Sequence, residues 1–152
     1  MIDLDEQIQM RKEKIFNASQ FVPTQWESAE DKAKFANKFV KLVESNFDRS
    51  KFPEWFYRRL SQCFSHIAHY NIEGFYYTWF SDQGRKYNFI LHTLSFPCYG
   101  DPGWTYSDVE KAIQAWLLST DWPKKYAELA DDEETAADRR VFDELKRKHG
   151  WE

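Results

Sequence analysis

Three residues of catalytic type stand at helical spacing near the middle of the chain. His66, His69 and Glu73 are separated by three and four positions, so one continuous helix would place neighbouring Cβ atoms about 5–6 Å apart. At that separation two imidazoles and a carboxylate can bind a divalent metal. The water bound to the metal would act as the nucleophile, while Arg59 or a distant acid orients the substrate. The pattern predicts a candidate metal-dependent hydrolase site, on the condition that the helix continues through Asn71.

A structural role for these histidines is the interpretation that we favour. They lie at the edge of an apolar stripe formed by Phe56, Leu60, Phe64 and Ile67. A neutral histidine at the edge of an aromatic core commonly donates a hydrogen bond to a backbone carbonyl. The spacing also differs from that of HExxH, in which two histidines four residues apart enclose the general base.

A third imidazole and the known cofactor motifs complete the search for catalytic chemistry. His92 could form an acid/base pair with His66 or His69, but no fixed spacing connects them. The sequence contains no GxSxG, Walker-A or GxGxxG motif, and its glycines are too scattered to hold a phosphate group. We therefore expect no cofactor, and a binding protein rather than an enzyme, with a metal-dependent or acid/base enzyme as the alternative.

Aromatic residues are more numerous than a core of this size requires, with seven tryptophans and eight tyrosines. Because interface hot spots favour these residues, we expect an adaptor-type or inhibitor-type protein that binds another protein. Tyr99 and Trp104, in a loop rich in Pro and Gly, are the candidate partner-binding residues. The segment 121–134 carries six acids and two lysines. It could meet a basic partner, although a solvated helix start is the interpretation that we favour.

Single-stranded nucleic acid is a further possible partner. Rings alternate with basic residues from Trp55 to Arg59 and again from Tyr76 to Lys86, and such rings can stack on unpaired bases. The formal net charge of −4 acts against this alternative, because phosphates require a basic surface.

Length and composition indicate one folded domain over residues 1–152. The chain has 42% hydrophobic and 30% charged residues, which excludes a disordered or collagen-like protein. Cys63 and Cys98 do not form a disulfide or zinc-ribbon pattern. No signal peptide and no apolar run of about 20 residues are present, so we expect a soluble, cytoplasmic protein without a membrane span. The oligomeric state is left open.

Helical periodicity dominates the elements that must position these residues. Ser28 and Asp31 predict the start of a helix that carries an apolar stripe and ends near residue 46. Further helices are predicted over 3–19, over 53–70, from a capping box of Ser107 and Glu110, over 123–130, and after the acidic run 131–134.

The segment 75–96 is ambiguous. Its aromatic and β-branched residues around Gly84 allow a β-hairpin, which would make the fold α+β. Its apolar spacing of three, one and three favours a helix, which we prefer. The sequence thus predicts an all-α, single-domain, irregular bundle of six to eight helices.

Overall fold

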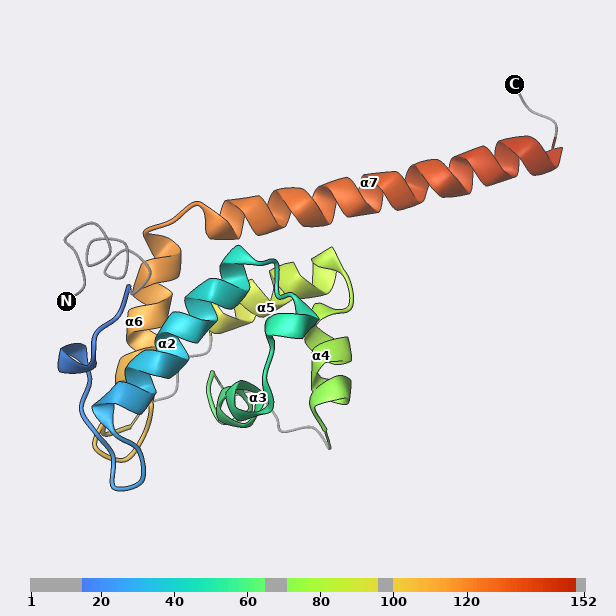
Figure 1. Ribbon diagram of the computed structural model, residues 1–152. Helices are drawn as coiled ribbons and strands as arrows, with labels where there is room; N and C mark the ends of the chain where they lie inside the picture. The colour runs from blue at the N-terminus through green and yellow to red at the C-terminus, as the bar shows by residue number, and fades with distance from the viewer. Residues whose placement is uncertain (1–14, 65–70, 96–99, 150–152) are drawn as a thin grey trace, which may run out of the picture.

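The computed structural model describes residues 15–64, 71–95 and 100–149 (Figure 1). Over these residues it contains no strand, so the predicted all-α class is confirmed and the hairpin alternative at 75–96 is not needed. Six α-helices and two 3₁₀-helices follow in the order η1 (Ala18–Gln20), α2 (Ala29–Glu44), η2 (Arg49–Lys51), α3 (Glu54–Leu60), α4 (Ile72–Phe80), α5 (Gln83–Ser95), α6 (Ser107–Leu118) and α7 (Trp122–His149). Most of the helix predicted over 3–19 lies outside the described residues.

Helix α2 forms the centre of the fold, and the sequence predicted its start correctly. The hydroxyl of Ser28 accepts a hydrogen bond from the backbone N–H of Asp31 at 3.1 Å, and the Asp31 carboxylate accepts from the N–H of Ser28 at 3.2 Å. This exchange satisfies two of the amide donors that a helix start leaves unpaired. The predicted stripe is buried throughout: Phe35, Phe39, Leu42 and Val43.

Phenylalanine rings from five segments fill the space beside α2. Phe39 contacts the rings of Phe47, Phe56, Phe64 and Phe89 at centroid separations of 6.0–6.5 Å. The rings of Phe47 and Phe80 stack at 4.5 Å. Such contacts stabilise a core beyond the area that they bury. Most rings of the central aromatic stretch are therefore accounted for by packing.

The helix predicted over 53–70 is shorter than expected. Helix α3 ends at Leu60, and Phe64 has a left-handed backbone with φ of 54°. The physical reason is a long-range contact, because the N–H of Phe64 donates to the buried carboxylate of Glu110 at 3.2 Å instead of to a carbonyl one turn earlier. Asn71 then caps a new helix, α4, by accepting from the N–H of Gly74 at 2.7 Å. The helix does not continue through Asn71.

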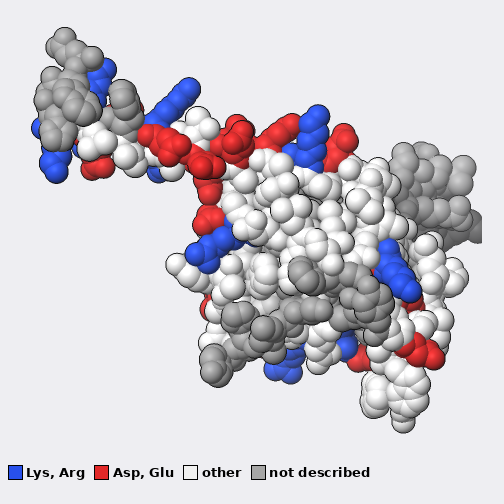
Figure 2. Space-filling view, turned by 180° about the vertical axis from the view of Figure 1, so that it is seen from behind, with Lys and Arg blue, Asp and Glu red and all other residues white. Residues whose placement is uncertain are grey.

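Helix α7 replaces the two helices predicted after residue 121. It is one helix of 28 residues, because the acidic run that we read as a boundary contains good helix formers and no breaker. Its first half packs along α5 and buries Tyr126, whose hydroxyl donates to the carbonyl of Val43 at 2.7 Å. Its second half projects from the body, as Figures 1 and 2 show from opposite sides. None of the helices described combines the length and apolar composition needed to cross a membrane.

Candidate functional site

Two members of the predicted catalytic set, Arg59 and Glu73, lie in separate ion pairs. The guanidinium of Arg59 pairs with the carboxylate of Glu27 and stacks 4.4 Å above the ring centre of Tyr106. Glu73 is exposed at the start of α4 and pairs with Arg49. The structure therefore does not bring Arg59 and Glu73 together.

The histidines of that set lie outside the described residues. His66 and His69 both fall in the gap between residues 64 and 71. In the part of the chain that is described, no three His, Cys, Asp or Glu side chains gather as a metal site requires. His92 is described, and its Nε2 lies 2.7 Å from the carbonyl oxygen of Phe64, with its ring 5.1 Å from that of Trp79. Because a carbonyl only accepts, Nε2 carries the proton there, and His92 ties α5 to the end of α3.

Two exposed tryptophans lie together on the surface, beside a hollow. Trp26 and Trp104 are 68% and 62% exposed, and their rings meet edge to face with centroids 5.8 Å apart. The hollow beside them has a volume of about 530 Å³. Its walls are formed by Trp26, Glu27, Arg59, Gln62, Cys63, Trp104, Thr105, Tyr106 and Glu110. We call this feature the tryptophan pocket.

A tight turn holds Trp104 in place. The N–H groups of Trp104 and Thr105 both donate to the carbonyl of Asp101, at 2.9 and 3.0 Å, and the Asp101 carboxylate accepts from Gly103 at 2.7 Å. Gly100 has φ of +155°, and a Cβ atom there would lie 2.9 Å from a methyl carbon of Thr105. The turn therefore requires glycine at position 100.

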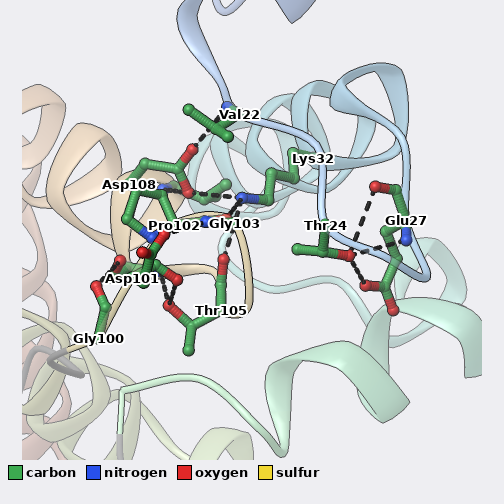
Figure 3. Close-up of polar contacts among 12 residues, drawn as sticks. Val22, Thr24, Glu27, Lys32, Gly100, Asp101, Pro102, Gly103, Thr105 and Asp108 are labelled. Atoms are coloured by element: carbon green, nitrogen blue, oxygen red, sulfur yellow. Dashed lines mark hydrogen bonds and ion pairs between the residues drawn. The ribbon is translucent and has the colours of Figure 1, made fainter.

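Lys32 anchors the same turn from below. This lysine of α2 is completely buried, and its ammonium donates to the carbonyls of Pro102 and Thr105 at 2.7 and 3.0 Å and to Asp108 at 2.9 Å (Figure 3). A buried charge is tolerated only when it is paired and hydrogen-bonded, as it is here. The loop that carries Trp104 is thereby fixed to the core helix.

A second compact turn positions Trp26. The hydroxyl of Thr24 accepts from the N–H groups of Trp26 and Glu27 at 3.1 and 2.8 Å and donates to the Glu27 carboxylate at 2.7 Å. Asp108 also accepts from the N–H of Val22 at 3.0 Å, through the oxygen that does not bind Lys32 (Figure 3). One carboxylate on α6 therefore connects the two segments that present the tryptophans.

The start of α6 differs from the predicted capping box. Ser107 is the first residue of the helix and its hydroxyl donates to the carbonyl of Gly100 at 2.8 Å. Because Tyr106 is the cap, Glu110 is the fourth residue of the helix and not the third, and its buried carboxylate accepts from the N–H of Phe64. Both side chains thus support the walls of the tryptophan pocket.

The electrostatics of the pocket keep its tyrosine neutral. Burial raises the pKa of the Tyr106 phenol to about 12; the nearby Arg59 acts to lower this pKa and Glu27 acts to raise it. The phenol therefore stays protonated near neutral pH. The pocket offers aromatic rings and one internally compensated ion pair, while the carboxylate of Glu110 is buried in its wall and accepts from Phe64.

The hollow continues along α2 toward a row of lysines. A smaller hollow shares Glu27, Arg59 and Tyr106 with the tryptophan pocket. It shares Lys34 and Trp55 with a third hollow, which also contains Lys38 and Lys41. Burial lowers the pKa of Lys38, and the neighbouring charges of Lys41 and Lys51 lower it further. The aromatic and acidic end of this groove thus differs in charge from its basic end.

Sequence reasoning named one of the two tryptophans. Trp104 was a candidate from its loop, and it is exposed as that reasoning required, whereas Tyr99 lies outside the described residues. Trp26 was missed, although its position in a short segment between Pro23 and the cap Ser28 was an available signal of exposure.

The acidic segment 121–134 forms the start of α7. Within it, the carboxylate of Glu133 accepts hydrogen bonds from the N–H of Gln83 at 3.0 and 3.1 Å.

Comparison with known proteins adds no functional assignment. Searches with the chain found no matching family model, no matching curated protein and no matching solved structure.

Proposed function

We propose that this chain is a protein-binding molecule of the adaptor or inhibitor type, and that the tryptophan pocket receives an apolar side chain of the partner. The observation that carries the proposal is the exposed pair of Trp26 and Trp104, held by two hydrogen-bonded turns beside a hollow. Tryptophan is enriched at interface hot spots, and a rigid ring loses little conformational entropy when it is covered.

The energy available from covering these rings is large. A tryptophan buries up to about 250 Å², so a ring that is 62% or 68% exposed has roughly 150 Å² left to cover. At about 25 cal/mol per Å², this corresponds to an upper value near 4 kcal/mol for each ring. Two such anchors, placed side by side, would contribute up to about 8 kcal/mol, whereas association costs at least about 4 kcal/mol, so other contacts of the interface must add to the affinity.

The charges of the pocket favour a protein over a nucleic acid. Among the described residues, Arg59 is the one Lys or Arg that lines it, and its charge is paired with Glu27, so the pocket offers no unpaired cation to the phosphates that dominate nucleic-acid binding. Lys34, Lys38 and Lys41 lie at the opposite end of the groove, away from the exposed tryptophan pair. For the metal-dependent alternative, Glu73 as a ligand and Arg59 as the residue that orients the substrate would lie close together, but these two side chains are engaged in different ion pairs.

Comparative capture from a cell extract tests the proposal. The wild-type chain, Trp26→Ala/Trp104→Ala and the control Tyr77→Ala, which removes a similarly exposed ring from α4, would each be immobilised, and the bound proteins quantified by mass spectrometry. We expect at least one protein to bind the wild type and the control but to fall at least tenfold with the double variant. Purified partner would then be titrated by calorimetry.

Two results would contradict the proposal. One is retention of every captured protein by the double variant, with its helical circular dichroism unchanged. The other is tight binding of labelled single-stranded oligonucleotides at physiological salt that is lost with the same two tryptophans, which would assign the pocket to nucleic acid.

A further inference from the structure

A basic hollow lies at the far end of the groove that begins at the tryptophan pocket. It has a volume of about 450 Å³, and Lys34, Lys38 and Lys41 of α2 line it. Among the described residues of its lining, Glu30 is the one Asp or Glu. We call this feature the lysine hollow.

The three lysines carry charges that the described part of the protein does not neutralise. The ion pairs found among the described residues use a buried lysine elsewhere on α2 and four arginines. The Nζ of Lys34 lies 4.4 Å from the ring centre of Trp55, but a ring bears no net charge. Burial lowers the pKa of Lys38, and the charges of Lys41 and Lys51 lower it further. These ammonium groups therefore repel one another, and a bound anion would relieve the repulsion.

One wall of the lysine hollow is held in place by hydrogen bonds. The side-chain oxygen of Asn37 accepts from the N–H groups of Ile15 and Phe16 at 3.0 and 2.9 Å, and its amide nitrogen donates to the carbonyl of Phe16 at 2.9 Å. Phe16 and Ala33 are buried and line the hollow with apolar surface. A ligand thus meets a preformed site, so less conformational entropy is lost on binding.

The spacing of the lysines indicates the shape of the anion. Lys34, Lys38 and Lys41 are four and three residues apart, which places them on one face of α2. Because an α-helix rises about 1.5 Å per residue, the row is about 10 Å long. An extended peptide rises about 3.3 Å per residue and presents alternate side chains on the same side, about 7 Å apart. Several carboxylates along one extended segment therefore match the row better than a single phosphate group does.

The lysine hollow and the tryptophan pocket belong to one groove. The smaller hollow between them shares Tyr106 with the tryptophan pocket, and it shares Lys34 and Trp55 with the lysine hollow. In the tryptophan pocket the charge of Arg59 is paired with Glu27, whereas the lysines at the other end are unpaired. A chain that follows the groove therefore fits with an apolar side chain at one end and acids at the other.

We infer that the lysine hollow binds an acidic, extended segment of the protein whose apolar side chain enters the tryptophan pocket. For the identity of the partner this inference rests on the proposed function. It adds the chemistry of a second contact, in which Asp or Glu side chains at alternate positions meet the lysine row. Such opposite charges raise the rate of association and select among partners that share the same apolar anchor.

Fluorescence anisotropy with labelled peptides tests the lysine hollow directly. The acidic probe is a short peptide in which Glu alternates with Ser, and its neutral counterpart carries Gln in place of every Glu. We expect the wild type to bind the acidic probe at low salt and to bind the neutral probe at least tenfold more weakly. Lys34→Gln/Lys38→Gln/Lys41→Gln should weaken binding of the acidic probe at least tenfold, and added salt should weaken it for the wild type.

A matched control separates the site from the net charge of the protein. Lys111→Gln/Lys124→Gln/Lys148→Gln removes the same charge from exposed positions on α6 and α7 and should bind the acidic probe as the wild type does. Helical circular dichroism should be equal for the two triple variants.

Five results would overturn the inference. They are no binding of the acidic probe by the wild type, equal losses in the two triple variants, and displacement by inorganic phosphate beyond that of sodium chloride at equal ionic strength. The others are tighter binding of a single-stranded oligonucleotide of equal charge, and self-association of the wild type that the lysine variant abolishes.

A bipartite probe distinguishes a failure of this inference from a failure of the proposed function. It joins a leucine to the acidic probe through a flexible Gly-Ser spacer. Affinity that falls with both the lysine variant and Trp26→Ala/Trp104→Ala would support one partner along the whole groove. A fall with the lysine variant alone would support the acidic site and reject its coupling to the tryptophan pocket. A fall with the tryptophan variant alone would overturn the inference and leave the proposed function standing.

Discussion

Replacement of Lys32 by methionine removes the buried cation beneath the tryptophan pocket. Methionine keeps most of the apolar stem, while the carbonyls of Pro102 and Thr105 and the carboxylate of Asp108 lose their shared donor. We expect the loop that carries Trp104 to lose its anchor to α2. Affinity for a partner of the pocket should fall together with stability.

The magnitude follows from the contacts. Breaking a buried ion pair by removing one partner costs about 3–5 kcal/mol. Asp108 retains the N–H groups of Val22 and Val109 as donors, each at 3.0 Å, so the lower end of that range applies. With a urea m-value of about 2 kcal/mol per molar, a loss of about 3 kcal/mol shifts the unfolding midpoint down by about 1.5 M.

Urea unfolding followed by circular dichroism measures this change. Lys38→Met is the matched control, because it makes the same substitution in the same helix outside the network, and its effect should stay within about 0.5 kcal/mol. In the double variant Lys32→Met/Asp108→Asn the carboxylate charge is also gone, so the loss should be smaller than the sum of the single losses. A loss below about 1 kcal/mol for Lys32→Met would show that the buried cation does not hold the loop to α2.

Three further predictions concern residues around the core. Tyr106 should ionise in an ultraviolet titration only near pH about 12, and this late step should be absent from Tyr106→Phe. Because the pKa of Tyr106 is higher in the folded than in the unfolded chain, the stability that it contributes is complete below about pH 10 and is lost as the pH rises toward 12. Glu110→Ala should cost roughly 1–3 kcal/mol in urea unfolding, because it removes the acceptor for the buried N–H of Phe64, and a neutral result would contradict that role. Asn46 has φ of 60°, a left-handed conformation that glycine adopts more readily than asparagine and that valine adopts with strain. Asn46→Gly should therefore leave the melting temperature unchanged or higher, whereas Asn46→Val should lower the free energy of unfolding by about 1–2 kcal/mol. Equal effects of the two substitutions would argue against backbone strain at this position.

Local pattern accounts for the elements that the sequence predicted well. The start of α2 could be predicted because Ser28 and Asp31 are three residues apart and the apolar stripe follows directly after them. The preference for helix over hairpin at 75–96 rested on apolar spacing, and the helical assignment is correct although the buried face differs, because α5 buries Phe89, Ile90 and Thr93 while Leu91 of the predicted stripe is exposed. Both signals involve residues within a few turns of one another.

Contacts between distant segments decided the rest. The end of α3 depends on Phe64 and Glu110, which are 46 positions apart, so a continuing apolar period could not reveal it. The predicted metal site needed one helix from Arg59 to Glu73, whereas α3 ends at Leu60 and Asn71 caps a new helix; its two histidines, His66 and His69, lie outside the described residues.

Residue pattern was enough to predict an all-α chain with an aromatic core and to identify Trp104 as a candidate surface residue. The position of Trp26 beside Trp104 follows from long-range contacts in the folded chain. Asp108 joins the two segments through hydrogen bonds to Val22 and Lys32, which are 86 and 76 positions away in the chain. Helical periodicity reports which face of a segment is buried, but it carries no information about which distant segment covers that face or which loops meet on the surface.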